Sequence, residues 1–247
     1  MSGLDGLAER TVAGLGWSSL ANGSQATVQI AALIVLLRFF SPEQFGLYYA
    51  AAATLGFATI LGTFGVSPAV VQRPGLEVRH IRTGFTIAVT ASIVVSSTIF
   101  FLADGIAEIL EMPKLAGVVR LMSIGLPLHG ISAVAEGLAL RAFRFRWLAG
   151  NDALSFAVGC LVIAPILALA GANVYSLVGA YLAQQALRSV ILLVGQPHAK
   201  YPMLQARELR ELLFFGSGFT LAKMGNYAAT QADNLVVGKW LGAAALG

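Results

Sequence analysis

Charged residues are absent from several long stretches of this sequence. Segments 11–37, 44–72, 83–103 and 153–187 contain no Asp, Glu, Lys or Arg. Each is long enough for a transmembrane helix, because about 20 apolar residues cross a hydrocarbon core of roughly 30 Å. Only 11% of the 247 residues are charged and 57% are hydrophobic, which excludes a water-soluble globular domain. The sequence therefore predicts an all-α polytopic membrane protein.

Seven helices are expected, near residues 14–39, 46–71, 83–103, 116–140, 153–170, 174–194 and 213–240. Ser41, Pro42 and Gln44 have the spacing of a capping box with proline at the first helical position, which predicts a tight hairpin between the first two helices. The expected domains are a six-helix transmembrane lobe (1–194), a cytoplasmic linker helix (195–212) and one further helix (213–247).

The distribution of positive charge predicts the orientation. With the N-terminus placed in the cytoplasm, ten Lys and Arg residues fall on the inner side and four on the outer side. Cytoplasmic loops carry this excess in membrane proteins. The same bias explains the net charge of +4 without a nucleic-acid partner.

Motifs for enzymatic chemistry are missing from the sequence. It contains no phosphate-binding GxxxxGK[ST] loop, no DxD motif, a single cysteine (Cys160) in an apolar run, and three histidines without metal-ligand spacing. We therefore expect no enzymatic activity, no cofactor and no metal site.

An internal repeat aligns the first and last predicted helices at an offset of 201 residues. Residues 19–21 (Ser-Leu-Ala) align with 220–222 (Thr-Leu-Ala), and 38–40 (Arg-Phe-Phe) with 239–241 (Lys-Trp-Leu). Six helices separate the two starts, so both copies enter the membrane from the same side, and the repeat is parallel, as in some secondary transporters. The second copy contains one helix of an expected six. This predicts a C-terminally truncated version of a protein roughly twice as long.

Four segments carry a family resemblance: LLRFFSPEQFGLYYAAAAT (36–54), ALRAFRFRWLA (139–149), GANVYSLVGAYL (171–182) and QADNLVVGKWLGAAALG (231–247). Together they resemble the lipopolysaccharide (O-antigen) and exopolysaccharide flippases of the multidrug/oligosaccharidyl-lipid/polysaccharide exporter superfamily. The resemblance implies two six-helix lobes in a V around a central cavity, in the bacterial inner membrane. It also implies movement of an undecaprenyl-diphosphate-linked oligosaccharide from the cytoplasmic to the periplasmic leaflet.

The partners implied by the resemblance are the lipid-linked oligosaccharide, membrane lipids, and polysaccharide polymerase and assembly proteins. The sequence departs from the family by lacking nearly all of the second lobe. Two alternatives therefore stand beside a flippase: a drug/cation antiporter of the same superfamily, and a non-transporting truncated membrane protein.

Polar residues at helical spacing predict the substrate cavity. They form one stripe on the first helix and a second on the last, in registers matched by the offset of 201: Asn22, Gln25 and Gln29, and Lys223, Asn226 and Thr230. Two matched stripes favour a polar cleft between the lobes. The alternative is hydrogen bonding between packed helices, which is common for such residues in membrane bundles.

Ionisable residues within the predicted spans are further candidates, because a charge in the membrane is costly and usually functional. Lys223 is the candidate cation for the lipid diphosphate; an ion pair with Glu136, or snorkelling to the membrane surface, is the alternative. His129 and Glu136 are spaced i, i+7, and with Asp233 they are candidates for coupling to an ion or proton. For Glu136 the spacing favours a structural ion pair with Arg188.

Overall fold

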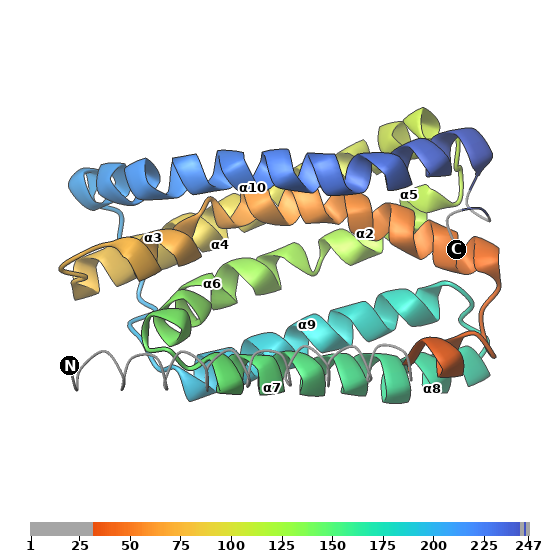
Figure 1. Ribbon diagram of the computed structural model, residues 1–247, viewed down its shortest axis with the longest axis horizontal. Helices are drawn as coiled ribbons and strands as arrows, with labels where there is room; N and C mark the ends of the chain where they lie inside the picture. Colours follow the sequence, from red (N-terminus) through yellow and green to blue (C-terminus); the bar gives the residue numbers. More distant parts are fainter. Residues whose placement is uncertain (1–31, 243–244, 246–247) are drawn as a thin grey trace, which may run out of the picture.

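The chain forms a two-layered helical assembly in the computed structural model, which describes residues 32–242 and 245. For residues 232–238 and 241 only the backbone is described. Figure 1 shows α10 beside α2 in one layer and α7, α8 and α9 in the other, with α6 between them. Within the described residues all regular structure is helical.

The predicted helix 46–71 is interrupted. Helix α2 (Pro42–Thr63) begins at the predicted capping box, in which Ser41 Oγ accepts from the Gln44 N–H and the Ser41 N–H donates to Gln44 Oε1. It ends at Phe64 and Gly65, whose φ angles of 47° and 65° are left-handed and cannot continue an α-helix. The short helix α3 (Val66–Gln72) follows.

The predicted helix 116–140 is also divided. The long α4 (Val78–Ile109) precedes it, and the region then forms α5 (Leu115–Ser123) and α6 (Leu126–Arg141). The interruption at Ile124 and Gly125 places Pro127 in the first turn of α6, where its missing N–H leaves no helical hydrogen bond unmade.

The next span is a single rod of three segments. It comprises α7 (Phe145–Ala157), the π-helical η1 (Val158–Ile163) and α8 (Ala164–Leu169). This span starts eight residues before the predicted start at 153 and therefore includes Asp152. Helix α9 (Tyr175–Gly195) returns along it.

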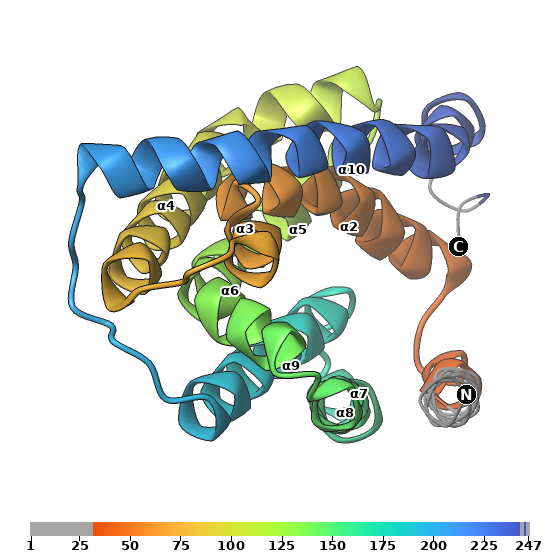
Figure 2. The ribbon, with the colours of Figure 1, turned by 60° about the vertical axis from the view of Figure 1, so that its left-hand side comes forward.

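Helix α10 (Ala206–Leu241) merges two predicted elements. Residues 196–205 cross between the two layers without helical structure, as Figure 2 shows. The helix then continues through residue 213, where the predicted linker helix would have ended, because the Glu-Leu-Arg-Glu-Leu-Leu run is made of strong helix formers. It packs against α2, α3 and α4.

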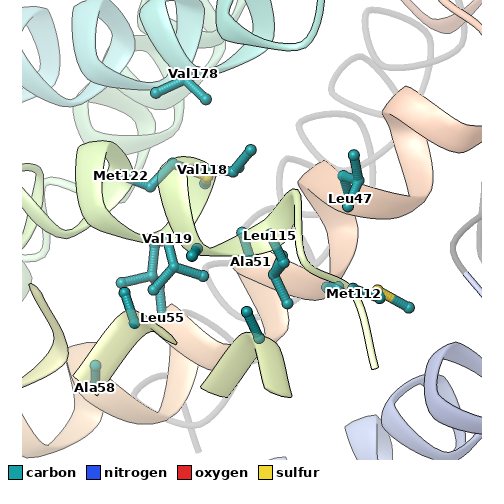
Figure 3. Packing of buried hydrophobic residues seen from close by; sticks show 14 of the residues in the cluster. Leu47, Ala51, Leu55, Ala58, Met112, Leu115, Val118, Val119, Met122 and Val178 are labelled. Carbon is teal, nitrogen blue, oxygen red and sulfur yellow. The ribbon is translucent and has the colours of Figure 1, made fainter. Parts of the chain in front are cut away.

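Buried apolar side chains hold the layers together. Figure 3 shows the largest cluster, in which Leu55 of α2, Leu115 and Met122 of α5 and Val178 of α9 meet. A second cluster joins α3, α4 and α6 to Leu212 of α10. Among the described residues, five helical segments are long and apolar enough to cross a bilayer: Pro42–Thr63, Val78–Ile109, Leu115–Arg141, Phe145–Leu169 and Tyr175–Gly195. The chain is a multi-pass α-helical membrane protein.

Candidate functional site

A cavity of about 430 Å³ lies among α2, α3, α6, α9 and α10. Its polar lining comes from five separate segments of the sequence, namely Thr59 and Thr63, Ser67 and Gln72, His129 and Glu136, Arg188, and Thr220 and Lys223. The cavity therefore brings together four residues that the sequence singled out individually: His129, Glu136, Arg188 and Lys223.

Small residues allow α10 to reach the cavity. The backbones of Gly65 and Gly216 approach so closely that a Cβ on Gly65 would overlap the Gly216 carbonyl oxygen. Further along α10, Tyr227 lies over Gly56, donates its hydroxyl to the Ala53 carbonyl (3.0 Å) and packs edge-on against Phe57. These contacts fix the orientation of α10, so that the side carrying Thr220 and Lys223 lines the cavity.

Arg188 of α9 is the centre of an ion cluster. Its Nη1 lies 3.3 Å from Glu136 Oε2 on α6, so the structure brings the predicted pair together. Its Nε donates to Asp152 Oδ1 on α7 at 2.6 Å. Glu136 lines the cavity, whereas Asp152 is not among the lining residues.

Sequence reasoning missed Asp152. The predicted helix began at residue 153, which placed this carboxylate in a loop, but α7 starts at Phe145 and carries Asp152 two turns into the span. One signal was available: Asp152 is the only acidic residue between Glu136 and Glu208. A lone carboxylate beside a long apolar run needs a partner, and Arg188 is the only basic residue in the following helix.

Further hydrogen bonds fix the backbone around Arg188. Asn151 Nδ2 donates to the Arg188 carbonyl at 3.2 Å, and Asn151 Oδ1 accepts from Ser155 Oγ. The adjacent Ser189 donates to the Leu128 carbonyl on α6 at 2.9 Å. Helices α6, α7 and α9 are thus joined at the level of the guanidinium.

The second cation, Lys223, is exposed and lines the cavity from α10. Two residues of its predicted stripe, Asn226 and Thr230, are also exposed but lie beyond the cavity lining. The Thr230 hydroxyl donates to the backbone carbonyls of Asn226 and Tyr227. Only the Lys223 end of the stripe therefore contributes to this cavity.

The remaining candidates fall outside what the structure describes. Asn22, Gln25 and Gln29 precede residue 32, and the side chain of Asp233 lies in the part of α10 described by backbone alone. Their roles, and the repeat that relates the two stripes, remain predictions.

The first turns of α10 are fixed by an ion network. Glu211 forms an ion pair with Arg73 Nη2 (2.7 Å) and hydrogen bonds with Arg207 Nε (3.1 Å) and His80 Nε2 (3.1 Å). His80 Nδ1 accepts the Glu77 N–H, so in the neutral ring Nε2 carries the proton and donates. The hydrogen bonds from His80 and Arg207 hold the pKa of the Glu211 carboxyl below its usual value.

Two arginines of the basic segment 141–146 bind helix ends. Arg141 Nη1 donates to the carbonyl oxygens of Val70, Val71 and Arg73 at the end of α3, at 2.9, 3.1 and 2.7 Å. Arg144 Nη1 donates to the Gly195 carbonyl at the end of α9 (2.6 Å), and its guanidinium stacks on Trp147. Positive groups satisfy the free carbonyls and negative dipole at these termini.

Comparisons with known proteins match this membrane architecture. The succinoglycan biosynthesis transport protein ExoT of Rhizobium meliloti (strain 1021) is 26% identical, with 92% of this chain and 46% of the relative aligned. The lipopolysaccharide biosynthesis protein WzxC of Escherichia coli (strain K12) is 25% identical, with 98% of this chain and 49% of the relative aligned. An uncharacterized membrane protein in the cps region of Klebsiella pneumoniae is 21% identical. No solved structure gives a significant match.

The chain spans about half the length of the curated relatives it matches. Residues 35–247, most of the sequence, match the family described as Polysaccharide biosynthesis protein. The chain belongs to this polysaccharide biosynthesis protein family.

Proposed function

We propose that this chain supplies the first lobe of an exporter that moves an undecaprenyl-diphosphate-linked oligosaccharide across the bacterial inner membrane. The observation that carries the proposal is the cavity, which Arg188 and Lys223 line together with residues of the candidate membrane spans α2 and α6. A diphosphate entering the membrane needs positive partners, because an unpaired charge is expensive there.

Hydroxyl groups supply the second requirement, which is recognition of a glycan. Thr59 and Thr63 line the cavity and donate their protons to the carbonyls of Leu55 and Thr59. Their oxygen lone pairs are therefore acceptors for sugar hydroxyls. The printed names of the two relatives, one a transport protein for succinoglycan and one a lipopolysaccharide biosynthesis protein, support a saccharide cargo.

A drug/cation antiporter is the less favoured function. Such a transporter needs excess negative charge in its cavity, and Glu136 does line this one. The lining also contains Arg188 and Lys223, however, so its formal charge is positive with His129 neutral. That sign favours an anionic cargo.

The proposal places the N-terminus in the cytoplasm, and it places lipids, polymerase and assembly proteins around the complete exporter. The cavity then lies in the cytoplasmic half of the bilayer, because α2 ends and α3 begins beside it. A headgroup arriving from the cytoplasm would meet Lys223 and Arg188 before reaching the other leaflet.

Polysaccharide export by the full-length protein tests this function. Lys223→Ala should reduce export severalfold with no loss of protein from the membrane fraction, and Lys223→Arg should retain most of it. Lys114→Ala is the matched control, because it also removes a lysine but from an exposed pair with Glu43. Normal export by Lys223→Ala would contradict the role given to the cavity.

A further inference from the structure

Two carboxylates share Arg188, and they differ in three respects. Asp152 contacts Nε at 2.6 Å, while Glu136 contacts Nη1 at the longer distance of 3.3 Å. Glu136 borders the cavity and Asp152 does not. Asp152 also follows Asn151, which is buried and bonded to the Arg188 carbonyl, so the same turn of α7 holds both the backbone and the side chain of the arginine.

The two carboxylates, Glu136 and Asp152, outnumber the one guanidinium that they share. A single guanidinium balances one of the two, and Arg188 is largely buried, with a side-chain exposure of 16%. The second cation at the cavity is Lys223, on another helix. Glu136 therefore lines the cavity together with both cations, whereas Asp152 contacts Arg188 without lining the cavity.

The remaining donors of Arg188 can serve a ligand. A guanidinium has five N–H donors, and the two ion pairs engage Nε and Nη1. An anion in the cavity would compete for Arg188 with the carboxylate on its own side. That carboxylate is Glu136, which holds Arg188 by the longer contact.

We infer that the two carboxylates divide their work: Asp152 is the positioning residue that holds Arg188 for an anionic headgroup, and Glu136 is the counter-ion that the headgroup displaces. The inference rests on the proposed function and assigns the diphosphate a site between Arg188 and Lys223. Loss of Asp152 would allow Arg188 to turn fully to Glu136 and form a bidentate pair. The headgroup would then compete with a stronger internal partner.

The division predicts opposite effects for two substitutions that each remove one negative charge. Glu136→Gln removes the competitor and tightens binding of the anion, whereas Asp152→Asn weakens it; we expect about tenfold in each direction. A long-range charge effect alone would tighten binding in both variants. A purely structural role would weaken it in both.

The experiment measures the dissociation constant of undecaprenyl diphosphate for the purified full-length protein in detergent, with undecaprenol as the uncharged control lipid. We expect tighter binding by Glu136→Gln, weaker binding by Asp152→Asn, and recovery in Asp152→Glu, which restores the carboxylate. Undecaprenol should bind equally to all variants. Shifts of the same sign in Glu136→Gln and Asp152→Asn would overturn the inference.

The Glu136→Gln arm decides the matter even if Asp152→Asn fails to fold, since unchanged or weaker binding by Glu136→Gln contradicts a displaced counter-ion. A wild-type protein that binds undecaprenyl diphosphate no better than undecaprenol would overturn the proposed function and the inference with it. Wild-type preference for the diphosphate, combined with same-sign shifts, would overturn the inference alone.

Discussion

Arg141 Nη1 lies 2.9 Å from the carbonyl oxygen of Val70, so the basic residue at the end of α6 closes the end of α3. The carbonyls of Val71 and of Arg73, the residue after α3, accept from the same nitrogen. A positive charge at a membrane edge is commonly explained as an orientation signal. Here the guanidinium also donates hydrogen bonds to backbone carbonyls at the end of α3, beside the candidate cavity.

The first prediction concerns this cap. Arg141→Ala should lower the free energy of unfolding by about 2 kcal/mol, because charge-assisted hydrogen bonds to part-buried carbonyls are lost. Arg141→Lys should lose less, since an ammonium group still donates to a helix C-terminus. Denaturation of the purified protein in detergent measures both, with Lys114→Ala as a surface control within about 0.5 kcal/mol of wild type. Equal stability of Arg141→Ala and wild type would exclude a capping role.

The second prediction concerns the pH dependence of the network at Glu211. The pKa of its carboxyl is lowered from the ordinary value of 4.5 by hydrogen bonds from His80 and Arg207, so the ionised form is favoured in the folded protein. This contribution is complete above pH 4.5 and is lost as the pH falls through the lower folded-state value. Melting temperatures measured from pH 5 down to pH 3 should therefore fall more steeply for wild type than for Glu211→Gln. Parallel curves would show that Glu211 makes no such contribution.

The third prediction compares two glycines with nearly the same backbone. Gly65 and Gly75 have φ angles of 65° and 66°, but a Cβ on Gly65 would overlap the Gly216 carbonyl oxygen, whereas one on Gly75 meets nothing within 4 Å. Gly75→Ala should cost about 1 kcal/mol for left-handed backbone. Gly65→Ala should cost at least about 2 kcal/mol more, since α10 must move away from the α2–α3 break. Similar unfolding free energies for the two variants would contradict the close contact.

Sequence patterns predicted much of this fold because the membrane imposes simple rules on length and charge. The capping box at Ser41 and the multi-pass helical architecture both followed from local chemistry. The break at Phe64–Gly65 was not foreseen, because it depends on a neighbouring helix approaching from far along the chain.

Less of the candidate site than of the fold could be predicted, because the site depends on contacts between helices that are distant in the sequence. His129, Glu136, Arg188 and Lys223 stand out as polar residues in apolar surroundings, and the fold brings them to one cavity. Asp152 escaped notice because helix ends predicted from charge can be misplaced by two turns. The simultaneous contact of Arg188 with Glu136 and Asp152 could not be predicted from the sequence, because it depends on how α6, α7 and α9 pack together.

The last prediction tests the contact between α10 and α2 through Gly56 and Tyr227. A Cβ on Gly56 would overlap the Tyr227 ring, so Gly56→Ala must displace that ring and break its hydrogen bond to the Ala53 carbonyl. We expect a cost of about 1 to 3 kcal/mol for the crowded contact. In a Tyr227→Ala background the same substitution should cost almost nothing, because the crowding atoms are gone. The double-mutant cycle should thus give a coupling of at least about 1 kcal/mol, measured as unfolding free energies in detergent.

Gly105→Ala is the control, since its Cβ would meet nothing within 4 Å and its effect should be independent of Tyr227. Additive effects of Gly56→Ala and Tyr227→Ala would mean that α10 does not rest on α2 in this register, and Lys223, one helical turn before Tyr227, would then lose its place at the cavity.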